Sequence, residues 1–159
     1  MESSPQNRGD IGSHIAMIVV TVANLIIITS FHEYIAWYAR QPDGSFTRLP
    51  VLTNGYFVWL PVPVFASIVA IVGYSVMIIY DRYWFRTIAQ IILHIVGIAV
   101  VVSLLSIFPF DFSVIPNATA VDVAPTGVTL FLVLMAVVYG VSALVLFVRL
   151  VVRYAVRGS

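Results

Sequence analysis

The sequence predicts an all-α integral membrane protein with four transmembrane helices in an antiparallel bundle. Apolar residues make up 61% of its 159 residues and charged residues 9%, whereas soluble domains contain about 45–50% and about 25%. The mean hydropathy is +1.04. Four stretches without Asp, Glu, Lys or Arg each exceed the roughly 20 residues that a helix needs to cross a bilayer. They cover residues 11–32, 49–80, 87–110 and 123–148, so residues 1–159 form a single transmembrane domain.

Prolines and charged residues set the expected bounds of the helices. Pro61 can begin the second helix, because the N–H groups of a first turn have no intrahelical partners. Pro109 ends the third helix. Only residues 81–86 join the second and third helices, which makes these two helices antiparallel neighbours. The first helix can continue along the membrane surface through the amphipathic stretch 34–38. The four helices are expected at about residues 14–31, 61–80, 87–108 and 126–148.

The positions of the arginines predict the orientation in the membrane. Basic residues near spanning segments favour the cytoplasmic side. With both termini inside, only Arg40 and Arg48 lie outside, in outer loops at about residues 32–60 and 109–125. We therefore expect a multi-pass protein of the cytoplasmic membrane with both termini cytoplasmic. The inner arginines are Arg8, Arg82, Arg86, Arg149, Arg153 and Arg157.

The two outer loops contain turn and aromatic patterns. Residues with turn chemistry flank the stretch 46–52, which predicts a short hairpin in the first loop. In the second loop, Phe108, Phe110 and Phe112 alternate with other residues, which puts three rings on one side of an extended segment. Such rings can anchor a loop in the membrane interface or line a groove for a partner.

Glycines inside the expected helices predict close packing. Gly73, Gly97 and Gly140 each lie in a run rich in Val, Ile and Leu. Small residues let helix backbones approach one another in a membrane. All three glycines are therefore expected to face neighbouring helices.

The composition argues against several function classes. The chain has no cysteine, which excludes disulfides, thiolate nucleophiles and Cys-ligated zinc or iron–sulfur clusters. Its net charge is only +1 and no basic patch could follow a phosphate backbone, so nucleic acid is not an expected partner. No catalytic motif or closely spaced set of metal ligands occurs. We therefore expect no catalytic residues, no metal site, no cofactor and no enzymatic activity.

Polar residues inside the membrane form the candidate site. His94 lies seven residues into the expected third helix, about 10 Å from its inner end, and Gln90 lies one turn below it on the same face. Polar and ionisable groups are costly in the bilayer and are often functional. We expect a polar layer in the inner half of the bundle, satisfied by hydrogen bonds between helices. Its candidate members are Thr21, Asn24, Tyr74, Ser75, Gln90, His94, Tyr139 and Ser142.

Three arginines follow the fourth expected helix. Arg149, Arg153 and Arg157 are four residues apart, so they share one face if the helix continues beyond the membrane. Arginines in this position can contact anionic lipid headgroups, each contributing about 1 kcal/mol. A simple stop-transfer signal is the alternative.

By elimination, the sequence favours a non-catalytic accessory, scaffold or partner-binding membrane subunit. Its expected partners are the lipid bilayer and either another membrane protein or further copies of this chain. A small oligomeric channel or transporter that uses the layer around His94 is one alternative, because histidine can exchange protons near neutral pH. A haem-binding electron-transfer subunit is the second alternative, although His14, His32 and His94 are expected at three different depths.

Overall fold

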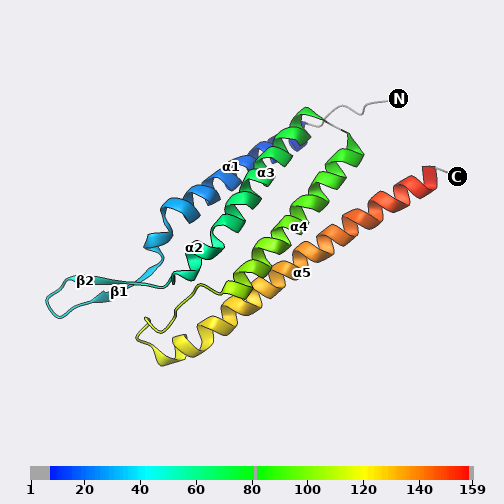
Figure 1. The fold of residues 1–159 in the computed structure, drawn as a ribbon. Helices are drawn as coiled ribbons and strands as arrows, with labels where there is room; N and C mark the ends of the chain where they lie inside the picture. Colours follow the sequence, from blue (N-terminus) through cyan, green and yellow to red (C-terminus); the bar gives the residue numbers. More distant parts are fainter. Residues whose placement is uncertain (1–7, 81, 158–159) are drawn as a thin grey trace.

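The structure is a computed structural model that describes residues 8–80 and 82–157. It is mostly helical, and four of its helical segments are long and apolar enough to cross a membrane, as in a multi-pass membrane protein. The elements in chain order are α1 (Arg8–Ser30), the 3-10 turn η1 (His32–Tyr34), β1 (Ala36–Arg40), β2 (Phe46–Pro50), α2 (Gly55–Trp59), α3 (Pro61–Ile79), α4 (Tyr83–Ile107) and α5 (Ala118–Arg157). The start of α1 and the end of α5 lie at the same end of the bundle, opposite the strands (Figure 1).

The spanning helices pack in the order α1, α3, α4 and α5. Helix α4 packs most extensively against α5, α1 packs against α3, and α3 packs against α4. Among the described residues, α1 and α5 have at most weak contact with each other. Most apolar side chains of the helices are therefore exposed at the surface of the single chain, where lipid or another protein can cover them.

Helix α1 begins at Arg8, about one and a half turns before the expected start at residue 14. It ends at Ser30, and the expected helical continuation over residues 34–38 is wrong, because residues 36–40 form strand β1. Trp37 and Tyr38 favour strands, and pairing with β2 satisfies backbone groups that an isolated helical extension would share with water. The less exposed side chains of α1 recur at alternating steps of three and four residues: Ile11, His14, Ile18, Thr21, Leu25 and Ile28.

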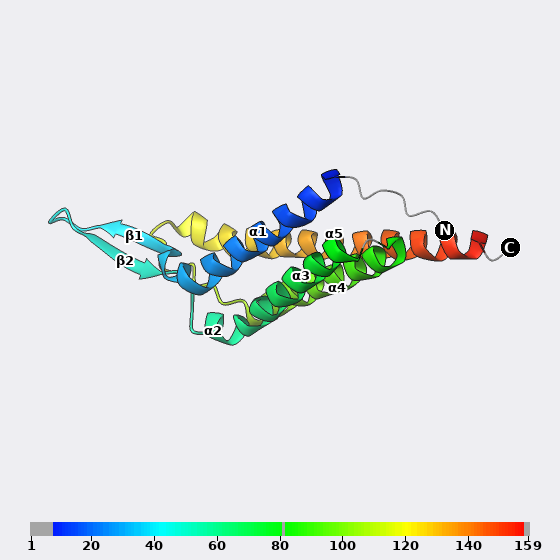
Figure 2. The same ribbon diagram turned by 90° about the horizontal axis from the view of Figure 1, so that it is seen from above.

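Strands β1 and β2 form the predicted hairpin, which is confirmed. They pair antiparallel, starting with Ala36 opposite Pro50. The turn closes where the Gln41 N–H donates to the Ser45 carbonyl at 2.8 Å. Gly44 has a φ of 85° there, a conformation that favours glycine. The hairpin extends away from the helices into the space beyond them (Figure 2).

The second spanning segment begins earlier than expected. Helix α2 starts at Gly55, and Leu60 between α2 and α3 is itself helical, with φ −50° and ψ −38°. Tyr56 and Trp59 therefore lie within the apolar span 55–79, not outside it as expected. The Tyr56 hydroxyl donates to the Ile28 carbonyl at 2.6 Å. This bond and the burial of both aromatic side chains favour helix before Pro61.

Helix α5 extends well past the expected span 126–148. The Asn117 side-chain oxygen accepts a hydrogen bond from the Ala120 N–H at 3.2 Å, which caps the helix start ahead of Pro125. The helix continues through Pro125 although proline removes one backbone donor. Its 40 residues reach about 60 Å, about twice the thickness of the hydrocarbon core. Helix α5 is therefore longer than a bilayer crossing requires.

The glycine predictions are confirmed at two of three positions. A Cβ on Gly73 would lie 3.6 Å from the side chain of Leu93, and one on Gly97 would lie 3.2 Å from the ring of Tyr139. The prediction for Gly140 is wrong, because a Cβ there would meet nothing within 4 Å. Helix α5 presents Tyr139, the residue before Gly140, to α4.

Candidate functional site

Each of the four spanning helices contributes one polar aromatic side chain to a common layer. We call the following four side chains the inner layer, a name that follows the orientation expected from the sequence: His14 of α1, Tyr74 of α3, His94 of α4 and Tyr139 of α5. The ring centroids of His14 and Tyr74 are 5.9 Å apart, as are those of His94 and Tyr139. Helix α3 packs against α4, which brings the two pairs of helices together. The layer therefore consists of two ring pairs, one that joins α1 to α3 and one that joins α4 to α5.

His94 is held by its own helix and by α5. Its Nδ1 lies 2.6 Å from the carbonyl oxygen of Gln90, one turn earlier. The ring of Tyr139 meets the His94 ring edge to face, with an interplanar angle of 74°. Gly97 leaves the space that the Tyr139 ring occupies, because any side chain at position 97 would crowd that ring. His94 thus faces another helix and is half-buried.

Several predicted members of the layer hydrogen-bond within their own helices. The Thr21 hydroxyl donates to the Met17 carbonyl at 2.7 Å, and the Ser75 hydroxyl donates to the Ile71 carbonyl at 2.7 Å. Gln90 contributes its backbone carbonyl to His94. Bonds of this kind satisfy a hydroxyl without a neighbouring helix. Ser142 is half-buried on α5.

The structure differs from the prediction at Asn24 and His14. Asn24 was expected in the polar layer but lies outside it, whereas His14 was not expected there but belongs to it. Because α1 begins earlier than expected, Asn24 lies in the half of the span 11–30 that is nearer the hairpin, and its side chain is exposed. His14, expected at the inner edge and left out of the predicted layer, is buried. The signal for His14 was present, since the uncharged run begins at Ile11.

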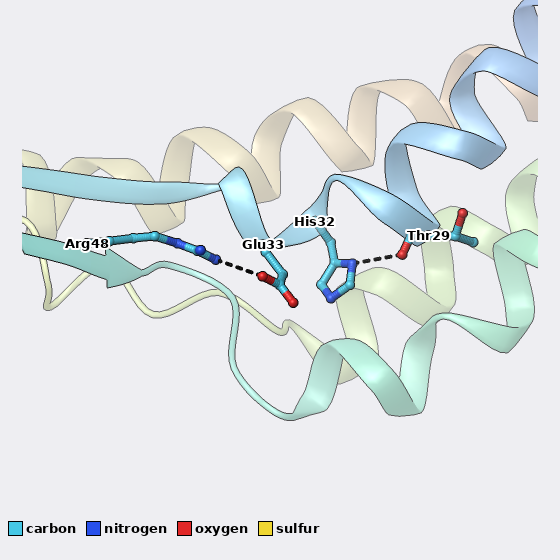
Figure 3. A network of polar contacts seen from close by, with 4 residues as sticks. All are labelled: Thr29, His32, Glu33 and Arg48. Atoms are coloured by element: carbon cyan, nitrogen blue, oxygen red, sulfur yellow. Dashed lines mark hydrogen bonds and ion pairs between the residues drawn. The ribbon is translucent and has the colours of Figure 1, made fainter.

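A second cluster lies at the hairpin end of the bundle, where α1 meets the hairpin and α2 (Figure 3). The His32 ring stacks on Tyr56 with ring centroids 5.3 Å apart, and its Nδ1 lies 3.1 Å from the Thr29 carbonyl oxygen. The next residue, Glu33, forms an ion pair with Arg48 of β2 at 3.7 Å. These contacts connect the end of α1 to both α2 and the hairpin.

The two outer loops are joined by backbone hydrogen bonds. The Thr53 N–H donates to the Pro109 carbonyl at 3.0 Å, and the Asp111 N–H donates to the Val51 carbonyl at 2.7 Å. Leu52 and Phe110 form the bridge between these bonds. The base of the hairpin is therefore fixed to the second loop, so the outer loops form one unit.

The three phenylalanine rings of the second loop lie together as predicted, but the segment is not extended at Phe108 as the prediction assumed. Ring centroids of Phe108 and Phe110 are 5.5 Å apart, and those of Phe110 and Phe112 are 5.9 Å apart. Phe108 adopts a left-handed conformation with φ 41°, which turns the chain sharply after α4. The rings pack on one another where the chain leaves α4.

Acidic side chains stabilise a turn in each outer loop. The Asp111 carboxylate accepts hydrogen bonds from the Ser113 hydroxyl at 2.6 Å and from the Ser113 N–H at 2.9 Å. Asp43 is bonded to Ser45 in the same way. Since these bonds favour the ionised form, the serine hydroxyls and N–H groups hold the pKa of both carboxyls below its ordinary value.

One face of the hairpin combines aromatic rings with arginines. Residues directly opposite each other in a hairpin lie on the same face. Tyr38 is paired with Arg48, and Arg40 is paired with Phe46. All four side chains are exposed, and we call them the hairpin face. The arginines and aromatic rings alternate across it.

Arginines of α5 lie at the opposite end of the bundle. The guanidinium carbon of Arg153 lies 3.7 Å from the centre of the Tyr83 ring, at the start of α4. Helix α5 continues through Arg157, so Arg149, Arg153 and Arg157 follow one face of it, as their spacing predicted. Arg149 and Arg153 are exposed, and contact with lipid headgroups stays a prediction.

The comparisons with known proteins leave the site to be judged on its geometry. The chain matches no model of a known protein family, no curated protein and no solved structure. Within residues 8–80 and 82–157, no three His, Cys, Asp or Glu side chains are grouped so that they could hold a metal ion.

Proposed function

We propose that the protein is a non-catalytic subunit of the cytoplasmic membrane that binds a partner protein through its hairpin face. In this proposal both termini are cytoplasmic and the hairpin lies on the outer side. The observation that carries it is the exposed alternation of Tyr38, Arg40, Phe46 and Arg48 on a hairpin that extends away from the helices (Figure 2).

The chemistry of the hairpin face supports a protein partner. Tyr and Arg are enriched among the residues that contribute most to protein–protein binding. A two-stranded hairpin is only marginally stable in water, and this one is fixed at its base by the Leu52–Phe110 bridge and the Glu33–Arg48 ion pair. A pre-positioned face loses little conformational entropy on binding. The two arginines favour a partner with carboxylates.

Isolation from native membranes tests this proposal. The full chain would be purified in mild detergent and its mass measured by native mass spectrometry. We expect a complex with a second protein that is lost in the double variant Tyr38→Ala/Arg40→Ala. Thr47→Ala is the matched control, since Thr47 is exposed on the other face of the same hairpin. Equal retention of the partner by the double variant and the control would contradict the proposal.

A second candidate function is transport of protons or small ions. The inner layer supports it, because its two ring pairs place one polar ring in each of the four spanning helices. Histidine can load and release protons near neutral pH. The test measures ion flux in proteoliposomes. If the protein is a transporter, the wild-type chain should carry ions and His94→Ala should reduce that flux. Flux no greater than in empty liposomes would contradict this second function.

A further inference from the structure

Helix α1 has two rows of residues spaced by alternating steps of three and four, which we call seams. Among residues 8–80 and 82–157, one of these seams packs against another spanning helix and the other does not. The inward seam, which includes His14 and Ile18, packs against α3. A second seam repeats the same alternating steps of four and three residues on another face of the helix. Its members are all exposed: Ser13, Met17, Val20, Asn24 and Ile27. Steps of this kind are the pattern by which one helix packs along another in a left-handed coiled coil.

Asn24 is the fourth of the five members of this second seam, and it is the polar member that lies deeper in the span than Ser13. Within the described part of the chain, no hydrogen bond joins its side chain to another residue. It lies six residues before Ser30, about 9 Å inside the outer end of α1. An amide exposed to hydrocarbon at that depth carries donors and acceptors that lipid tails cannot satisfy.

Two exposed hydroxyls in the spans, those of Thr29 and Ser106, differ from Asn24. The Thr29 hydroxyl donates to the Leu25 carbonyl at 2.7 Å, and the Ser106 hydroxyl donates to the Val102 carbonyl at 3.0 Å. These hydroxyls are satisfied within their own helices and can face lipid at little cost. Asn24 therefore requires a partner from outside the chain.

We propose that α1 pairs in parallel with α1 of a second copy of this chain along the second seam, with Asn24 opposite Asn24. Two copies inserted in one membrane have the same orientation and the same depth, so a two-fold axis normal to the membrane brings identical residues together. A carboxamide both donates and accepts, and a pair of them satisfies itself. A single Asn in a seam of apolar residues fixes register and the number of helices.

The second copy occupies a surface distinct from the hairpin face. The seam lies along α1 within the membrane span, whereas the hairpin face lies beyond the outer end of the helices (Figure 1). Self-association through the seam and binding of a different protein through the hairpin can therefore be separated by substitution.

Disulfide cross-linking in native membranes tests the pairing, because the full chain has no cysteine of its own. Val20→Cys and Ile27→Cys lie on the seam, and Ile15→Cys and Val22→Cys are exposed controls on another face of α1. We expect oxidation to give covalent dimers for the two seam variants and none for the two controls. Equal dimer yields at seam and control positions, or no dimer at any position, would overturn the proposal.

The contribution of Asn24 is measured in the Val20→Cys background. Hydrogen bonds between membrane helices correspond to about a three- to tenfold change in association, so Asn24→Leu should lower the dimer yield by a factor in that range. Asn24→Gln should restore most of it. Thr29→Val is the matched control and should leave the yield unchanged, since Thr29 is satisfied by its own helix. An unchanged yield in Asn24→Leu would overturn the role of the amide.

The two proposals fail in distinguishable ways. If Asn24→Leu lowers the dimer yield while a second protein still co-purifies in full, self-association through α1 and partner binding are separate properties. If Tyr38→Ala/Arg40→Ala instead loses that protein while cross-linking through α1 is unchanged, the two properties are again shown to be separate. Cross-linking of Val20→Cys to a different protein in place of a second copy would overturn self-association and leave the hairpin proposal standing.

Discussion

At the residue scale, short-range contacts decide how polar groups and glycines behave. Asp111 and Gly97 are both positions where one neighbouring side chain sets the effect of a substitution. The matched positions Asp43 and Gly140 provide controls within the same chain.

The first prediction concerns Asp111. Hydrogen bonds from Ser113 lower the pKa of Asp111 in the folded chain, so Ser113→Ala should raise that pKa toward the ordinary Asp value of about 3.9. Because the folded pKa is depressed, the carboxylate contributes stability at pH values above the ordinary pKa. That contribution is lost as the pH falls through the folded value. NMR titration of the carboxyl carbon in micelles measures the change, and an unchanged pKa would contradict it.

Asp43 is the control for the titration. It is bonded to Ser45 in a separate turn, so Ser113→Ala should leave the pKa of Asp43 unchanged. A rise at both aspartates would indicate a general loss of structure in the outer loops.

The second prediction concerns Gly97. Its position faces the Tyr139 ring at 3.2 Å, so Gly97→Val should overpack the contact between α4 and α5 and destabilise the protein by about 1–3 kcal/mol. Gly140→Val introduces the same residue into a helix with nothing within 4 Å of the new Cβ. The free energy of unfolding in mixed micelles should fall more for Gly97→Val. Equal losses would show that helix propensity alone decides both.

At the element scale, caps and turns set where helices begin. Helix α5 begins at Ala118 although Pro125 lies inside it, and the Asn117 side chain bonds the first turn. Helix α2 also follows an asparagine, Asn54, whose side chain makes no capping bond.

The third prediction follows from this difference. Asn117→Ala should lower the free energy of unfolding by about 1 kcal/mol, because it leaves the Ala120 N–H without its side-chain acceptor. Asn54→Ala should have a smaller effect, since no capping bond is lost. Both variants would be measured in mixed micelles. A larger loss for Asn54→Ala would contradict the assignment of Asn117 as the cap.

At the scale of the whole molecule, the start of α1 and the end of α5 share one end of the bundle (Figure 1). The hairpin lies at the other end, with α2 and the second outer loop (Figure 1). The fold places these two ends at opposite ends of the bundle, and the side of the membrane that each end faces is tested separately.

The fourth prediction is that the hairpin end faces outward, which follows from the placement of the arginines. Ser45→Cys and Ser159→Cys can each be introduced into the naturally Cys-free chain and treated with an impermeant thiol reagent on intact cells. Ser45→Cys should label, and Ser159→Cys should label only after the cells are opened. Labelling of Ser159→Cys alone on intact cells would contradict this orientation and indicate the opposite one.

The sequence by itself determined the four apolar spans, the presence of a hairpin in the first loop and the gathering of the three phenylalanines, but not β1, the first strand of that hairpin. Each of these depends on local chemistry: hydropathy over about 20 residues, turn residues, and alternation along an extended segment. The hairpin was expected around residues 46–52, and β2 covers 46–50. Such patterns need no knowledge of what lies next to them.

Only the tertiary structure decided which side chains share a layer and which lie on the outside. The start of α1 at Arg8 moves Asn24 away from the inner layer and brings His14 into it, because each residue of a helix adds about 1.5 Å of depth and 100° of rotation. The same holds for Gly140, which differs from Gly97 only in what its helix face meets. The faces of a helix acquire their roles from neighbours distant in the sequence, and a local pattern contains no information about them.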